Sequence, residues 1–280
     1  MIQIQGVSVP SFIYGTAWKE DRTRELTLQA LRAGFRAVDT ANQRRHYVEA
    51  AVGEAVAAFL GEGHTHDELF LQTKFTYARG QDHRLPYDPR APYAAQVEQS
   101  FASSLEHLQV THLDSYVLHG PEGGYGLTEG DLAVWRAMEA LHAAGKTRLL
   151  GVSNVSRGQL QTLYRHAAIK PAFVQNRCFA RDGWDAEIRA FCRDHGAVYQ
   201  GFSLLTANVR EISGPVIPGL ARRLGRTPAQ VAFRFALEVG MIPLTGTSSP
   251  AHLSEDLACL DFRLDADAVR AIEGGREAAP

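Results

Sequence analysis

The strongest constraint on the fold of this chain is an alternation of short apolar runs with segments of helical periodicity. Eight apolar runs occur, and a segment with apolar residues three and four positions apart follows each one. Short apolar runs bounded by polar residues are typical of buried parallel strands, and the longer spacing is typical of covering helices. No break in composition separates the pairs. The pattern predicts an α/β fold in which residues 1–280 form one domain, a (β/α)8 TIM barrel.

The expected elements alternate along the whole chain. The strands are Phe12–Gly15, Ala37–Asp39, Leu69–Lys74, Ser115–His119, Leu149–Val152, Phe173–Gln175, Val198–Phe202 and Met241–Leu244. The helical segments cover about residues 22–33, 47–60, 97–108, 134–141, 157–166, 186–195, 216–239 and 251–260, with a last helix at 266–272. Thr227 followed by Pro228 predicts a helix start, because threonine caps helix N-termini and proline suits the first helical position.

Three of the expected strands end in an ionisable residue. Asp39, Lys74 and His119 each stand at the carboxyl end of an apolar run. A charged group in that position costs free energy unless it is paired or used in chemistry. In a barrel of alternating strands and helices, catalytic residues lie at this end of the strands. We therefore expect the three residues to share an active site.

Lysine is scarce among the basic residues and occurs only at positions 19, 74, 146 and 170. Arginine is used at most other basic positions, yet a lysine is kept inside an apolar strand. This pattern favours a functional role for the titratable amine of Lys74. The turn-rich segment Thr76–Pro92 follows that strand and is expected to overhang the site. Tyr77 in this segment is a candidate substrate contact, and a solvated excursion of the chain is the alternative.

Composition argues against several classes of partner. The net charge of -2 provides no basic field for nucleic acid or an anionic membrane, and no apolar stretch approaches the roughly 20 residues that span a bilayer. The start, Met1–Gln5, has neither the basic segment nor the apolar core of a signal peptide. Cys178, Cys192 and Cys259 lack metal-site spacing and are expected to be reduced. We expect a cytoplasmic protein, a monomer or weak homo-oligomer, that acts on a small molecule.

Four segments together resemble the aldo-keto reductase family. They are Gly34-Phe35-Arg36-Ala37-Val38-Asp39-Thr40-Ala41, Thr73-Lys74, Asp114-Ser115-Tyr116-Val117-Leu118-His119 and Gly151-Val152-Ser153-Asn154. They occur in that family's order, and four motifs in register are more specific than any one of them. The resemblance covers nearly the whole chain. It implies a (β/α)8 barrel and the NAD(P)H-dependent reduction of an aldehyde or ketone to an alcohol.

The resemblance and the chemistry of carbonyl reduction together imply catalytic roles for four residues. Tyr47 is expected to donate a proton to the carbonyl oxygen as the general acid. Lys74 would lower the pKa of this tyrosine, which is near 10 when unperturbed, and Asp39 would keep Lys74 charged and oriented. His119 would hydrogen-bond and polarise the carbonyl oxygen.

The position of the tyrosine departs from the family pattern. Most members carry it five residues after the aspartate, where this chain has Arg44, so the segment before Tyr47 is longer by a couple of residues. If this loop runs differently, His46 is the alternative acid, because its unperturbed pKa is nearer neutral. Arg44 and Arg45 would then lie beside the pocket mouth, either favouring an anionic substrate or as ordinary solvated charges.

The resemblance also implies contacts to a nicotinamide ring. Ser153, Asn154 and Gln175 correspond to the side chains that hydrogen-bond the carboxamide in the family. Phe202 stands where a tyrosine usually stacks on the ring, and stacking requires only an aromatic face.

The resemblance also implies roles for two further segments, one at the cofactor and one at the substrate. Ser203 and Leu205 fall in the family's pyrophosphate loop, where leucine replaces the usual proline. Trp18 is placed to wall the substrate pocket, with packing at the barrel rim as the alternative.

The segment expected to bind the adenosine end departs most from the family. Its candidate contacts are Gly246, Thr247, Ser248, His252, Glu255 and Asp256. Gly246 replaces a lysine and His252 an arginine, and the loss of two permanent cations weakens recognition of a 2′-phosphate. Hydroxyl groups and backbone amides at a helix start can still bind that phosphate. We expect NADP(H), with NAD(H) as the alternative.

Two other functions compete with an active reductase. The displaced tyrosine and the altered phosphate site are compatible with a cofactor-binding redox sensor or interaction module of little turnover. A metal-dependent barrel enzyme would need several convergent ligands, and the strand ends offer only Asp39 and His119. We therefore expect no metal site.

Overall fold

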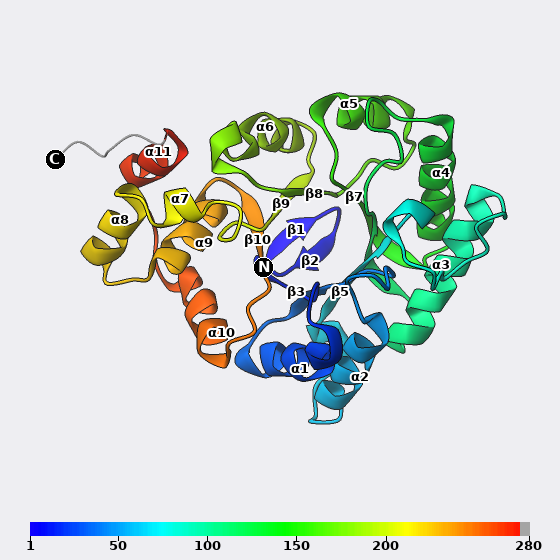
Figure 1. Ribbon diagram of the computed structural model, residues 1–280, viewed down its shortest axis with the longest axis horizontal. Coiled ribbons are helices and arrows are strands. Elements are labelled where there is room, and N and C mark those ends of the chain that lie inside the picture. The colour runs from blue at the N-terminus through cyan, green and yellow to red at the C-terminus, as the bar shows by residue number, and fades with distance from the viewer. Residues whose placement is uncertain (275–280) are drawn as a thin grey trace.

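Eight parallel strands form a closed barrel in the computed structural model, which describes residues 1–274 (Figure 1). They are β3 (Ile13–Gly15), β4 (Ala37–Asp39), β5 (Phe70–Phe75), β6 (Leu113–Leu118), β7 (Thr147–Ser153), β8 (Phe173–Arg177), β9 (Val198–Phe202) and β10 (Met241–Thr245). Strand β10 pairs with both β9 and β3 and so closes the barrel. The predicted (β/α)8 barrel is confirmed, while residues 275–280 of the predicted domain lie outside the described residues.

Helices surround the barrel and follow its strands (Figure 1). They are α1 (Thr23–Ala33), α2 (Glu49–Leu60), α3 (Tyr93–Leu108), α4 (Glu129–Ala143), α5 (Arg157–His166), α6 (Ala186–Asp194), α7 (Val209–Ile212), α8 (Val216–Leu224), α9 (Pro228–Glu238), α10 (Pro250–Leu257) and α11 (Ala266–Gly274). The expected segment 216–239 is divided, because Gly225 has a left-handed φ of 64° and the Thr227 side chain accepts a hydrogen bond from Gln230 N.

One helix boundary differs from the prediction in a way that matters for the site. Helix α2 begins at Glu49, so Tyr47 lies in the loop before it rather than in its first turn. The backbone of Val48 has φ −121° and ψ 75°, which is outside the helical region. The loop between β4 and α2 therefore positions the tyrosine.

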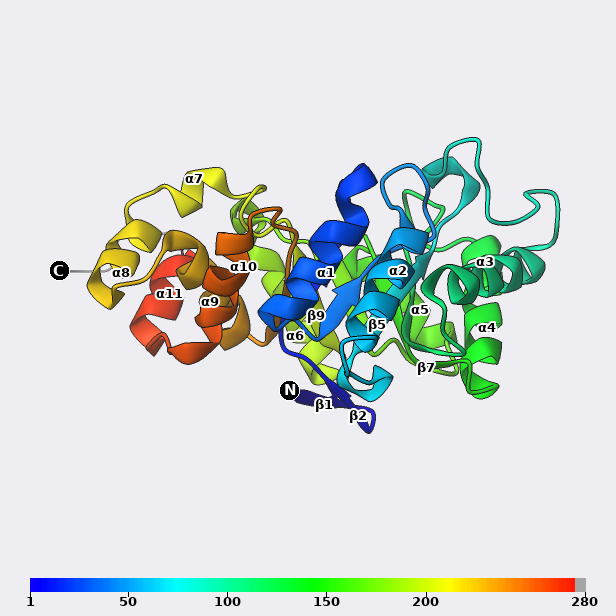
Figure 2. The same ribbon diagram turned by 90° about the horizontal axis from the view of Figure 1, so that it is seen from below.

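A two-stranded hairpin that periodicity did not predict covers one end of the barrel. Strands β1 (Ile2–Ile4) and β2 (Val7–Val9) pair antiparallel, and Figure 2 shows them beneath the barrel. Ile4, Val7 and Val9 join a buried apolar cluster with barrel residues such as Phe70 and Phe173. The hairpin thus closes the amino-terminal end of the strands and leaves the carboxyl-terminal end for the site.

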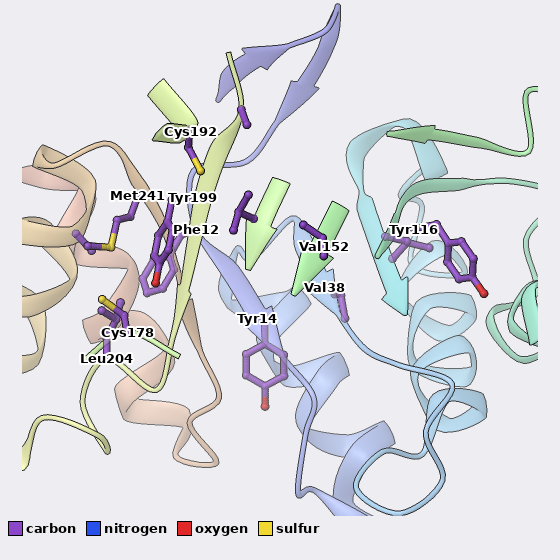
Figure 3. Packing of buried hydrophobic residues seen from close by; sticks show 14 of the residues in the cluster. Phe12, Tyr14, Val38, Tyr116, Val152, Cys178, Cys192, Tyr199, Leu204 and Met241 are labelled. Atoms are coloured by element: carbon purple, nitrogen blue, oxygen red, sulfur yellow. The ribbon is translucent and has the colours of Figure 1, made fainter. Parts of the chain in front are cut away.

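A continuous apolar layer packs between the strands and the surrounding helices. Figure 3 shows part of it, with Tyr14, Val38 and Tyr199 among the buried side chains. Cys178, Cys192 and Cys259 are buried and unpaired with one another. Among the helices of residues 1–274, none combines the length and apolar character needed to cross a bilayer.

Candidate active site

A cavity of about 1250 Å³ opens among the loops at the carboxyl-terminal ends of the barrel strands. Most of the candidate site residues line it: Trp18, Asp39, Tyr47, His119, Ser153, Asn154, Gln175, Phe202, Ser203, Leu205, Gly246, Thr247, Ser248, His252, Glu255 and Asp256. Lys74 lies directly behind Asp39. Tyr77 is the candidate that the structure places elsewhere.

Asp39 and Lys74 form a buried ion pair at the floor of the cavity. The side chains come from the neighbouring strands β4 and β5, and Lys74 Nζ donates to Asp39 Oδ2 at 2.6 Å. The same amine donates to the carbonyl oxygen of Thr40 at 2.8 Å. Burial lowers the pKa of Lys74, while the charge of Asp39 opposes this shift. Burying the charged amine of a lysine costs free energy, and these hydrogen-bond partners offset that cost.

Tyr47 lies against this ion pair. The centroid of its ring is 5.4 Å from Lys74 Nζ and 6.0 Å from the centroid of the His119 ring. Burial, with a further contribution from the charge of Asp39, raises the pKa of Tyr47 above its usual value. We expected Lys74 to lower it. The difference has a physical cause, because burial removes the water that would solvate the phenolate, and the negative charge of Asp39 disfavours the phenolate further.

His119 is held in its neutral form beside the tyrosine. Burial, together with the charge of Lys74 and of His46, lowers the pKa of His119 to about 3. Its Nδ1 shares a hydrogen bond with Thr76 Oγ1 at 2.7 Å. Thr76 was not among the site residues predicted from the sequence. A usable signal existed, because side chains two positions apart on a strand point to the same side, and Thr76 stands two residues after Lys74.

Trp18 and His46 form the mouth of the cavity. Their ring centroids are 3.8 Å apart, and Trp18 N donates to the carbonyl oxygen of His46 at 2.8 Å. Trp18 remains 69% exposed. The stacking draws His46 toward the rim, whereas Tyr47 faces Lys74 and His119.

A second cavity of about 510 Å³ adjoins the same loop. Arg44, Arg45 and Arg84 line it together with Tyr47 and acidic residues such as Asp21. Arg84 forms an ion pair with Asp82 and donates to the carbonyl oxygen of Arg44, so its charge is already satisfied.

Polar side chains at the carboxyl-terminal ends of β7 and β8 line the cavity, and β7 lies opposite β3 in the strand order. Ser153 Oγ donates to the carbonyl oxygen of Gln175 at 2.6 Å, and Asn154 Nδ2 donates to the carbonyl oxygen of His119 at 2.8 Å. Asn154 has a positive φ of 52°, a strained conformation that is common where a side chain is held for function.

Lys19 supplies a basic side chain at the other end of the cavity and was not among the site residues predicted from the sequence. Its Nζ donates to the carbonyl oxygen of Gly246 and lies 3.5 Å from where a Cβ at Gly246 would stand. The amine thus occupies the space beside the glycine that replaces the family's lysine. The scarcity of lysine, which was applied only to Lys74, would also have drawn attention to Lys19.

Acidic residues line the same cavity. Asp256 accepts a hydrogen bond from Thr245 Oγ1 at 2.7 Å, and burial raises the pKa of Asp256 to about 6. Glu255 is exposed on the same helix, α10. The cavity therefore has both signs of charge where the adenosine end was expected to bind.

Tyr77 corrects the sequence prediction. It is 4% exposed, and its hydroxyl donates to Asp131 Oδ1 at 2.8 Å, near the start of α4. Thr76 turns toward His119, so the next side chain points to the opposite side and away from the cavity. Tyr87 of the same loop donates to the carbonyl oxygen of Thr76 at 2.7 Å. The hydrogen bonds of Tyr77 and Tyr87 hold the loop after β5 in place.

Within residues 1–274, no three or more histidine, cysteine, aspartate or glutamate side chains gather as they would around a metal ion.

The comparison with known proteins identifies the family, and this chain belongs to the aldo-keto reductases. The model of the Aldo/keto reductase family matches residues 12–210 and 215–277. An aldo-keto reductase of Mycolicibacterium vanbaalenii is 32% identical over 247 residues, which are 88% of this chain and 81% of that protein. An aldo-keto reductase of Mycobacterium avium is 31% identical over 255 residues, which are 91% of this chain and 82% of that protein.

Solved structures agree with this assignment at the level of the fold. An aldo/keto reductase from Brucella melitensis superposes with a TM-score of 0.83 at 24% identity, over 98% of both chains. Membership of this family indicates an oxidoreductase and supports carbonyl reduction in general.

Proposed function

We propose that this protein reduces an aldehyde or ketone to the corresponding alcohol, with a reduced nicotinamide dinucleotide as the reductant and Tyr47 as the proton donor. The observation that carries the proposal is the position of Tyr47, which lines the large cavity beside His119 and the buried Lys74. The ring of Tyr47 lies between Lys74 Nζ, 5.4 Å from its centroid, and the ring of His119, 6.0 Å away.

The residues of the cavity fit a nicotinamide dinucleotide. Ser153, Asn154 and Gln175 would hold the carboxamide, and the aromatic face of Phe202 would cover the ring. When bound in reduced form, this cofactor supplies a hydride to a carbonyl carbon. A volume of about 1250 Å³ exceeds the roughly 300–1,000 Å³ of pockets for drug-sized ligands, which leaves room for a dinucleotide and a small substrate.

Tyr47 would hold its proton until negative charge develops on the carbonyl oxygen. Its raised pKa keeps the phenol neutral in the resting site. Lys74 would then stabilise the phenolate that remains after proton transfer, an interaction stronger in the transition state than in the ground state. Asp39 keeps the lysine in place through the 2.6 Å ion pair.

His119 would orient the carbonyl oxygen as a neutral hydrogen-bond donor. With its pKa lowered to about 3, the ring is uncharged at neutral pH. When Thr76 Oγ1 donates to Nδ1, the single ring proton lies on Nε2, which can donate to the substrate.

NADP(H) is our proposed cofactor, and NAD(H) is the alternative. Lys19, with the hydroxyl groups of Thr247 and Ser248, supports binding of a 2′-phosphate. Glu255 and Asp256 line the same end of the cavity and oppose a dianion. The preference for NADP(H) over NAD(H) is therefore expected to be modest.

The decisive experiment measures NADPH consumption with para-nitrobenzaldehyde for the wild type and Tyr47→Phe. Loss of general acid catalysis is expected to lower kcat by about 10²–10⁴-fold while the dissociation constant for NADPH changes little. Tyr164→Phe is the matched control, because it removes a buried hydroxyl whose hydrogen bond goes to the carbonyl oxygen of Pro171.

A third variant separates the alternatives for the acid. Full activity in Tyr47→Phe, with loss in His46→Asn, would assign the proton to His46 and overturn our assignment. A wild type that binds NADPH but turns over no aldehyde or ketone in a panel would favour the redox sensor instead.

A further inference from the structure

Three buried glutamines surround the inner side of Asp39. Gln72 is on β5, Gln175 on β8 and Gln200 on β9. Gln72 Nε2 and Gln175 Nε2 donate to the same oxygen, Asp39 Oδ1, at 2.7 and 3.0 Å. Both amides also donate to Gln200 Oε1, at 2.9 and 3.0 Å. Gln200 Nε2 returns a hydrogen bond of 3.2 Å to Gln72 Oε1.

The charge of Asp39 determines which way each of these amides faces. A carboxylate that is paired with a lysine only accepts hydrogen bonds, so Gln72 and Gln175 must turn their NH₂ groups toward it. Their second protons then require an acceptor, which makes Oε1 of Gln200 face them. The NH₂ group of Gln200 is left to donate to Gln72. A single orientation satisfies the whole network.

One polar atom of this network remains for a ligand. Gln175 lines the cavity, whereas Gln72 and Gln200 do not belong to its lining residues in the described chain. Both protons of the Gln175 amide are used within the protein. Within residues 1–274, Gln175 Oε1 accepts no hydrogen bond, so it is the acceptor that the site offers.

We propose that Gln72 and Gln200 are positioning residues that lock Gln175 with its oxygen available to the cofactor, so that the pocket selects a nicotinamide ring bearing an amide NH₂. This inference rests on the proposed use of a nicotinamide cofactor. Gln72 and Gln200 act only through Asp39 and Gln175. Polar side chains inside a barrel cost free energy unless they are hydrogen-bonded, and here each amide nitrogen and oxygen of the three glutamines has a protein partner except Gln175 Oε1.

The test compares binding of NADPH with binding of its reduced 3-acetylpyridine analogue, in which a methyl group replaces the NH₂. Dissociation constants are measured from quenching of protein fluorescence, without substrate or turnover. We expect the wild type to bind NADPH about tenfold more tightly, the value of one hydrogen bond to a fixed acceptor. Equal affinity of the wild type for the two cofactors would overturn the proposal without any variant.

The variants Gln72→Met and Gln200→Met keep the length of the side chain and remove its hydrogen bonds. Each is expected to reduce the discrimination to less than about threefold. Gln200→Met removes the second acceptor of the Gln175 amide, and Gln72→Met removes the group that holds Gln200, so Gln175 keeps its hydrogen bond to Asp39 but is no longer fixed. Gln159→Leu is the matched control, because this buried glutamine makes its hydrogen bonds at α5 and to Gly123 and Gly126. Discrimination that survives in both methionine variants, or is lost in the control as well, would contradict a positioning role.

The outcome is separable from that of the proposed function. Turnover that fails while the wild type still prefers the carboxamide would contradict only the reductase proposal. Turnover that succeeds while the two cofactors bind equally would contradict only the role of the glutamines.

Discussion

The two ends of the large cavity differ in how their charges are held. At the catalytic end, Asp39 and Lys74 are 3% and 1% exposed and are joined by a 2.6 Å ion pair. At the Gly246 end, His252 and Glu255 are exposed, while Lys19 and Asp256 are buried without forming such a pair with each other. Removing one partner of a buried pair is costly, whereas exposed charges contribute little. The proposed chemistry thus depends on a buried ion pair, whereas the proposed cofactor preference depends on a mixture of exposed charges and the separately held Lys19 and Asp256.

The largest expected effect comes from breaking the ion pair at the catalytic end. Lys74→Met leaves the carboxylate of Asp39 buried without its cation and is expected to destabilise the fold by about 3–5 kcal/mol. Urea denaturation measures this change. The double variant Asp39→Asn/Lys74→Met removes both charges, so it should recover much of the stability but none of the reductase activity. A single variant as stable as the double would show that the pair is not tightly coupled.

An intermediate effect is expected at the opposite end. Lys19→Met removes the amine beside Gly246 and is expected to raise the dissociation constant for NADPH by about 10–100-fold, the value of a hydrogen bond to a charged group. Fluorescence titrations with NADPH and NADH measure it, and kcat should change far less than KM. Lys146→Met, at an exposed lysine outside the cavity lining, is the control. Unchanged affinity for both cofactors would remove Lys19 from the site.

The smallest expected effect is a dependence of cofactor binding on pH. Because burial raises the pKa of Asp256 to about 6, this carboxyl gains its negative charge as pH rises through that value. NADH affinity should therefore fall a few-fold between about pH 5 and 7, and NADH avoids titration of a 2′-phosphate. Asp256→Asn should abolish the change. A pH dependence that persists in this variant would exclude Asp256 as its cause.

The raised pKa of Asp256 also predicts how the free energy of unfolding changes with pH. The pKa of Asp256 is raised from 3.8 to about 6 on folding, so the native state binds the proton more tightly. Its contribution to stability is full below about pH 3.8 and is lost as pH rises through 6. Asp256→Asn should flatten this part of the stability profile, and an unchanged profile would contradict the raised pKa.

The fold was predictable because hydrophobic periodicity is a local property. Each strand was found from its own apolar run, and the carboxyl ends of the strands identified Asp39, Lys74 and His119 as neighbours. The hairpin β1–β2 was not predicted because no helical segment follows either strand, so it lies outside the strand–helix alternation that identified the barrel strands. The prediction for Tyr77 was wrong because length and turn content locate a loop without saying which side chains turn inward.

The sequence alone sufficed for the barrel, for the family and for the set of polar residues at its open end, because these depend on short patterns read in order. Only the closed barrel joined Gln72, Gln175 and Gln200 into one network around Asp39, and only the folded loops placed Lys19 beside Gly246. Strand closure joins residues more than a hundred positions apart, as the Gln72–Gln200 contact shows. Such contacts, and the burial that shifts the pKa values of Tyr47 and His119, are properties of packing and leave no local pattern along the chain.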